Sequence, residues 1–169
     1  MIRKIVVGDI LDPRNTSDII IGMNTELDEV TGIGLPFVRN TIPEIALDLG
    51  SVITFKFDAY RRLHMLICHR LGLGGWERAE DHIRYGLDYL NHYRTDDREF
   101  SIVQIGCGQV GTRDRAPCEQ IFRAMATSSL PVDLYVYEGA SMAAPQEREP
   151  LKPLQAFASS TQDFVPLLR

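Results

Sequence analysis

The chain has few of the residues that build cross-linked or metal-bound domains. Its 169 residues include three cysteines, which are Cys68, Cys107 and Cys118. An odd number at wide spacing predicts neither a disulfide framework nor a zinc site. We therefore expect reduced thiols in a cytoplasmic protein. The four histidines show no ligand spacing with cysteines or acids, so no metal and no cofactor is expected.

Basic charge and long apolar runs are scarce as well. The formal net charge is −5, which argues against nucleic acid as a partner, because such binders usually present a basic face. The longest apolar runs have the length of strands, so no membrane span is expected. Arg3 and Lys4 are followed by only a short apolar run, which does not fit a signal peptide.

Alternating strand-like and helix-like segments predict an α/β fold. Six runs rich in β-branched and aromatic residues predict strands over 2–7, 18–23, 52–57, 63–68, 100–105 and 132–137. Apolar residues at helical spacing predict helices over 77–93 and 117–126. The third and fourth strands are joined by the short link 58–61, which predicts a hairpin. We therefore expect a mixed central sheet of about six strands in a layered fold.

The character of the chain changes after Gly139. Residues 1–139 are expected to form one domain, and residues 140–169 a C-terminal extension. Its Pro, Ala and charged residues predict an extended or loosely docked segment. The alternative is an arm that docks on this or another subunit, which would make the tail a means of self-association.

Three glycines follow the predicted strand 100–105. They occupy positions 106, 108 and 111. A loop with so little side chain exposes backbone N–H groups, which suits a phosphate. The spacing also matches the dinucleotide fingerprint of a Rossmann domain, but the context does not. Five residues separate the loop from the next helix, and only one further strand remains.

Two other segments fit a phosphate ligand that carries a nucleoside. Residues 31–37 form a second glycine-rich loop after a strand, so the two loops together could clamp a diphosphate. Asp9 follows the first strand, where its carboxylate could accept a hydrogen bond from the amine of adenine. Alternatively, Asp9 caps a turn.

The order of these motifs resembles the macrodomain family of ADP-ribose-binding modules. The motifs are Gly-Asp-Ile at 8–10, Asp-Ile-Ile-Ile-Gly-Met-Asn at 18–24, Gly-Ile-Gly-Leu-Pro-Phe at 32–37, Ile-Gly-Cys-Gly at 105–108 and Leu-Tyr-Val-Tyr at 134–137. The similarity spans about residues 2–138 and is greatest to terminal ADP-ribose glycohydrolases and phage-type or bacterial ADP-ribose-phosphate processing proteins. It implies a three-layer α/β/α fold.

The resemblance also implies a role for each matched residue. Asp9 would hold the adenine amine, with the backbone of Ile10 nearby, and Asn24 would lie near the distal ribose. Tyr137 would stack on adenine, or is an ordinary strand aromatic. The residues that would wrap the diphosphate are Gly32, Ile33, Gly34, Leu35, Gly106, Cys107, Gly108, Gln109, Val110 and Gly111.

Departures from that pattern leave three functions open. Related hydrolases carry a Lys just after the first glycine loop or an acid in the second, and Val38 and Val110 stand there. This favours binding of ADP-ribose, or of an ADP-ribosylated protein, with little or no catalysis. The first alternative is a hydrolase that uses Asn24 and an ordered water to remove ADP-ribose from protein or the terminal phosphate from ADP-ribose phosphate. The second is a divergent scaffold with a vestigial pocket and an assembly tail.

Overall fold

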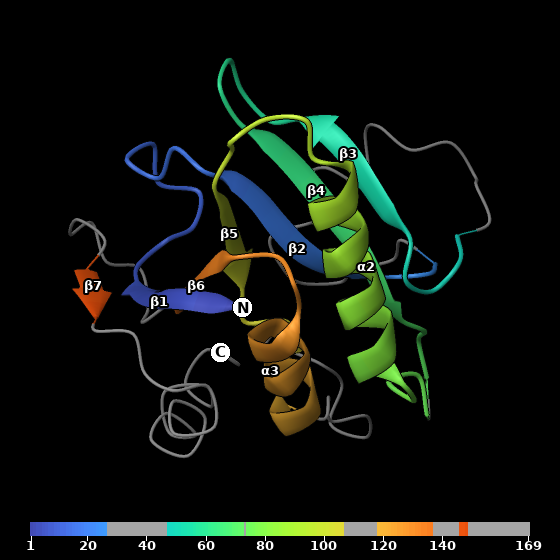
Figure 1. Cartoon of the computed structure of the whole chain (residues 1–169). Coiled ribbons are helices and arrows are strands. Elements are labelled where there is room, and N and C mark those ends of the chain that lie inside the picture. Colours follow the sequence, from blue (N-terminus) through green and yellow to red (C-terminus); the bar gives the residue numbers. More distant parts are fainter. Residues whose placement is uncertain (27–46, 73, 107–117, 137–145, 149–169) are drawn as a thin grey trace.

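A single mixed sheet organises the molecule, and both helices of the described residues lie on one face of it (Figure 1). The computed structural model describes residues 1–26, 47–72, 74–106, 118–136 and 146–148. Its elements are β1 (Ile2–Val7), β2 (Asp18–Asn24), β3 (Val52–Lys56), β4 (Arg62–His69), α2 (Ala79–Tyr93), β5 (Phe100–Val103), α3 (Cys118–Thr127), β6 (Val132–Val136) and β7 (Gln146–Arg148). The six predicted strands and the helices predicted over 77–93 and 117–126 are present, with bounds that differ from the predictions by at most two residues.

The strand order across the sheet is β3-β4-β2-β5-β6-β1-β7. The five strands from β4 to β1 run parallel to one another, and β3 and β7 pair antiparallel at the two ends of the order. The predicted α/β class with a mixed sheet is therefore confirmed. The seventh strand, β7, was not predicted, and it pairs with β1 through partners such as Val6 and Glu147. The division of the chain at residue 139 stays a prediction.

The central strands are apolar on both sides because both faces of the sheet are buried. Ile19, Ile20 and Ile21 are all fully buried. On the helix face, α2 and α3 lie side by side over the sheet (Figure 1). Gly86 of α2 brings that helix close, since a Cβ there would lie 2.8 Å from two side-chain atoms of Leu66. A separate apolar cluster on the other face contains Ile19, Ile21, Met23, Met65 and Ile67, with Leu47 and Leu49 packed against it.

The link between β3 and β4 is the predicted hairpin. The Asp58 carboxylate accepts the backbone N–H groups of Tyr60 at 2.8 Å and Arg61 at 2.7 Å, which closes the turn. None of the helices in the described ranges is long and apolar enough to cross a membrane.

Candidate functional site

The carboxyl ends of the five parallel strands meet at one edge of the sheet. Ligands of open α/β sheets bind outside that edge, because loops and helix N-termini converge there. Across the strand order, this edge presents His69 at the end of β4, Asn24 at the end of β2, Gly106 beyond β5 and Asp9 beyond β1. Four strand steps separate β4 from β1, which is about 19 Å at about 4.8 Å per step.

Asp9 both caps a turn and keeps an exposed carboxylate. Its Oδ1 accepts the backbone N–H of Leu11 at 2.9 Å, and its carbonyl accepts the N–H of Asp12 at 3.1 Å. The turn-capping alternative is thus realised by one carboxylate oxygen. Ile10 is buried in the core with its carbonyl bound by Asn15 Nδ2 at 2.8 Å, so its side chain does not face the surface. Recognition of adenine by Asp9 and Ile10 stays a prediction.

Asn24 ends β2 as a buried side chain with 1% of its surface exposed. Its Cα pairs with that of His69 across a register shift between Met23 and Asn24. The N–H of the next residue, Thr25, donates to the His69 carbonyl at 3.0 Å. The backbones of Asn24 and His69 are therefore neighbours at this edge.

The end of β5 approaches β2 closely at Gly22. A Cβ on Gly22 would lie 2.8 Å from Ile105 Cγ2 and 3.2 Å from Cys68 Sγ, so only glycine fits there without a shift of the neighbours. Gly106 follows Ile105 with φ at 80°, in the region that favours glycine. The second glycine loop therefore starts directly after the point where Ile105 contacts Gly22 of β2.

The remaining predicted site residues lie outside the described part of the chain. They are Gly32, Ile33, Gly34, Leu35, Cys107, Gly108, Gln109, Val110, Gly111 and Tyr137, together with Val38. The contribution of both glycine loops to a diphosphate clamp stays a prediction, as does the stacking of Tyr137 on a base.

His69 is a member of this edge that the sequence patterns did not single out. Its imidazole stacks on the indole of Trp76, with ring centroids 3.9 Å apart and planes 7° from parallel. Trp76 is buried, with 7% of its surface exposed. The signal in the sequence was the position of His69 at the carboxyl end of a buried strand. Metal-ligand spacing, the criterion applied to the histidines, does not detect it.

Burial controls the protonation of His69. It lowers the pKa of the imidazole to about 4, and the negative charge of Glu26 opposes the shift only in part. His69 is therefore uncharged at neutral pH. The Glu26 carboxylate accepts the backbone N–H of Leu71 at 3.2 Å, which ties the segment after β4 to the end of β2.

The segment between β4 and α2 is closed by its own backbone. Arg70 N–H donates to the Gly75 carbonyl at 2.9 Å, and Gly75 N–H donates to the Gly72 carbonyl at 3.0 Å. A Cβ on Gly75 would lie 1.9 Å from the Arg70 carbonyl oxygen, so the turn requires glycine. This closure returns the chain so that Trp76 covers His69.

Gln104 carries a second unusual feature of this edge. It is 7% exposed, and neither its amide nitrogen nor its amide oxygen has a hydrogen-bond partner among the described residues. Leaving a buried polar group unpaired costs about 1–3 kcal/mol. Gln104 directly precedes Ile105 and Gly106, so this unpaired amide lies just before the start of the second glycine loop.

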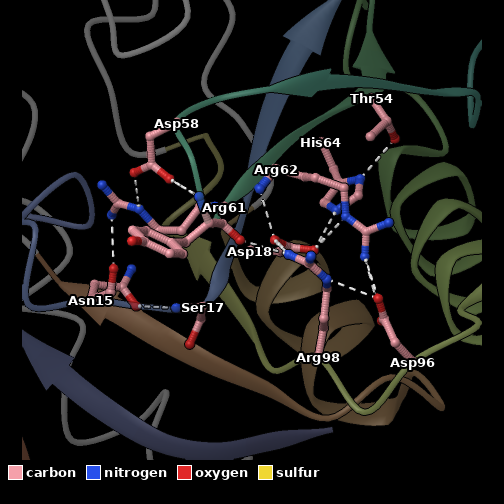
Figure 2. A network of polar contacts seen from close by, with 11 residues as sticks. Asn15, Ser17, Asp18, Thr54, Asp58, Arg61, Arg62, His64, Asp96 and Arg98 are labelled. Atoms are coloured by element: carbon pink, nitrogen blue, oxygen red, sulfur yellow. Dashed lines mark hydrogen bonds and ion pairs between the residues drawn. The ribbon is translucent and has the colours of Figure 1, made fainter.

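A second polar cluster lies at the opposite, amino-terminal edge of the sheet (Figure 2). Asp18 begins β2 and is 1% exposed. Its carboxylate accepts hydrogen bonds from Arg62 Nε at 2.9 Å and Arg98 NH1 at 3.1 Å, and it lies 3.5 Å from His64 Nε2. Arg62 and Arg98 are also both paired with Asp96. The charges are satisfied within the cluster, which therefore joins strands and offers no site for a ligand.

No metal site is formed by the residues with described positions. Among them, there is no group of three or more His, Cys, Asp or Glu side chains that could hold an ion.

Comparison with known proteins identifies the fold. No protein-family model matches the sequence, and no curated protein does. A solved macrodomain protein from Streptomyces coelicolor superimposes with a TM-score of 0.53 at 16% identity, over 80% of this chain and 98% of that one. The macrodomain of Thermus aquaticus DarG gives a TM-score of 0.48 at 16% identity, over 80% of this chain and 97% of that one. The likeness to the Streptomyces structure shows that the chain has the macrodomain fold.

Proposed function

We propose that the chain binds ADP-ribose, or a related nucleotide diphosphate, along the carboxyl edge of its sheet. The observation that carries the proposal is the order of groups along that edge. An exposed carboxylate at Asp9 stands at one end, a glycine with positive φ at Gly106 stands in the middle, and Asn24 stands towards the other end. A ligand with a base, a diphosphate and a second sugar presents its parts in the same order.

The spacing supports an elongated ligand. Asp9 and Asn24 follow strands three steps apart, or about 14 Å at about 4.8 Å per step. In this arrangement the Asp9 carboxylate accepts the adenine amine through Oδ2, because Oδ1 is occupied by the Leu11 N–H. The backbone around Gly106 faces the diphosphate, and Asn24 hydrogen-bonds the far ribose. ADP-ribose attached to a protein would be recognised in the same way, in a protein we place in the cytoplasm.

Titration calorimetry with ADP-ribose tests the proposal. We expect saturable binding to the wild-type chain, and weaker binding to Asp9→Asn by roughly tenfold, which corresponds to about 1.4 kcal/mol. The asparagine retains an oxygen for the Leu11 N–H but turns an NH₂ donor towards the adenine amine. Absence of binding at millimolar ADP-ribose would reject the proposal in favour of a scaffold whose pocket is vestigial.

Asp12→Asn is the matched control for that experiment. Asp12 lies in the same turn, but its carboxylate pairs with Arg14 at 2.6 Å. This variant removes the same charge without touching the group assigned to adenine, so its affinity should equal that of the wild type. If both variants weaken binding equally, net charge explains the effect and Asp9 has no specific role.

A further inference from the structure

The edge that we propose to bind ADP-ribose holds a titratable side chain next to the far ribose. Asp9, Gly106 and Asn24 account for the base, the diphosphate and one contact to that ribose. The edge continues one strand further, to His69 on β4, whose Cα pairs with that of Asn24. An uncharged imidazole there supplies the kind of group that proton transfer requires.

The orientation of His69 is fixed from two sides. Its ring is stacked on the buried indole of Trp76. Its Nδ1 lies 3.5 Å from Cys68 Sγ, and that sulfur lies 3.8 Å from the Met23 carbonyl oxygen, to which the thiol donates. We assign the thiol hydrogen to the Met23 carbonyl, so that the sulfur meets Nδ1 as an acceptor. The proton of the neutral ring is then on Nδ1, which leaves a lone pair on Nε2.

Nε2 has no hydrogen-bond partner among the described residues. Glu26 is placed to stabilise the imidazolium, since its negative charge acts on His69 and its carboxylate is held by the Leu71 N–H. Arg70, which is exposed, acts on Glu26 in turn. A base with a fixed ring, an available lone pair and a nearby carboxylate matches the usual organisation of a catalytic histidine.

We propose that His69 is a catalytic residue: its Nε2 takes a proton from a water molecule that attacks the far ribose of the bound ligand. This inference rests on the proposed binding of ADP-ribose. The water oxygen bonds to the anomeric carbon, and the bond from that carbon to the attached group breaks with its electron pair going to the leaving atom. His69 then returns the proton to the leaving group or to solvent, so that one water is consumed and a free ribose hydroxyl is formed.

A chromogenic ligand gives a direct test. ADP-ribose with a 4-nitrophenoxy group on the far anomeric carbon, made as each anomer, releases nitrophenolate, which leaves as an anion and requires no acid from the protein. We expect the wild-type chain to cleave one anomer. His69→Gln should be slower by on the order of 100-fold. Its Kd for ADP-ribose should stay within about threefold, which is less than 1 kcal/mol.

His92→Gln is the matched control, because His92 is exposed on α2 and lies on a different element. It should cleave at the wild-type rate. Added imidazole should restore part of the activity of His69→Ala, which a merely structural role of His69 would not allow. The wild-type rate should be constant around neutral pH and should fall as the pH approaches about 4, where His69 becomes protonated.

The outcomes separate this inference from the proposed function. If ADP-ribose binds but neither anomer is cleaved, or if His69→Gln cleaves as fast as the wild type, His69 is not the base and the binding function stands. If ADP-ribose does not bind, both proposals are wrong. If His69→Gln fails to fold, the wild-type pH profile decides, because a rate that persists unchanged through pH 4 in the folded protein overturns the inference.

Discussion

Asp18 is a buried carboxylate whose ionised form is stabilised by neighbouring side chains. Burial alone would raise the pKa of its carboxyl group, but the His64 imidazole 3.5 Å away and the hydrogen bonds from Arg62 outweigh this effect and lower the pKa to about 2. A carboxyl group with a lowered pKa stabilises the fold above its unfolded pKa. That stability is lost as the pH falls from about 4 towards 2. At neutral pH the shift corresponds to about 2 kcal/mol.

We predict that Asp18→Asn destabilises the chain at neutral pH by at least this amount, because Arg62 and Arg98 lose their shared acceptor. Urea denaturation of wild type and variant at several pH values measures the difference. The difference in unfolding free energy between the wild type and Asp18→Asn should become smaller as the pH falls below about 4. Asp81→Asn, which affects an exposed pair with Arg78, should change stability by less than about 1 kcal/mol. A gap that is independent of pH would contradict the assignment.

Trp76 contributes to the burial that keeps His69 uncharged. Its indole removes water from one face of the imidazole, so replacing the stack should raise the pKa of His69 from about 4 towards the ordinary value. Trp76→Leu keeps apolar volume while removing the flat ring. An NMR titration of the His69 ring protons measures the shift.

Tyr93→Leu provides the comparison for Trp76→Leu. Tyr93 is 62% exposed and contacts His92, at a ring distance of 4.7 Å, rather than His69. The His69 titration should therefore be unchanged in this variant. An equal shift in both variants would mean that a global loosening, and not local desolvation, changes the pKa.

At the scale of helices and strands, features set by the local sequence could be predicted, and features set by contacts with other segments could not. Strand bounds followed from continuous apolar runs such as Ile19 to Ile21, because both faces of the sheet are buried. Asp9, Asn24 and Gly106 could be picked out because each follows a predicted strand, whereas the parallel direction of these strands, which puts the three residues at one edge, is shown by the structure. The His69–Trp76 stack could not be predicted, because it depends on a turn closed through Gly75. β7 was missed because three residues of mixed polarity carry no strand pattern of their own.

At Gly86 of α2, packing against the sheet and not helix propensity selects the residue type. Helix propensity favours alanine over glycine by about 1 kcal/mol. A Cβ at Gly86 would, however, lie 2.8 Å from Leu66 Cγ, in the interface of α2 with β4. We predict that Gly86→Ala lowers the unfolding free energy, because overpacking costs about 1–3 kcal/mol.

A double-mutant cycle identifies Leu66 as the cause of that cost. In a Leu66→Ala background the nearest atoms are removed and the Gly50 carbonyl oxygen remains 3.3 Å from the added methyl group, so Gly86→Ala should there cost less stability than in the wild type. Denaturant midpoints of the four proteins give the coupling energy. Additive effects of the two changes would mean that the contact with Leu66 is not what excludes alanine.

At the scale of the whole molecule, charge sets how an anionic ligand can be held. The chain carries a formal charge of −5, and the four edge residues assigned to the ligand are an acid, an amide, a glycine and an uncharged histidine. Affinity for a diphosphate must then come mainly from backbone N–H groups and directional hydrogen bonds rather than from lysine and arginine. Short hydrogen bonds of this kind are screened little by salt, whereas repulsion between the net negative chain and the ligand is screened.

We therefore predict that the affinity for ADP-ribose stays constant or rises when the ionic strength increases from low to physiological. A site built on several cations would lose affinity over the same range. Calorimetry at a series of NaCl concentrations measures the trend, with ADP as a ligand that lacks the far ribose. If both ligands show the same rise, screening of the shared diphosphate explains it. A steep fall in affinity with salt would place unrecognised basic side chains at the site and would contradict a clamp formed by the backbone.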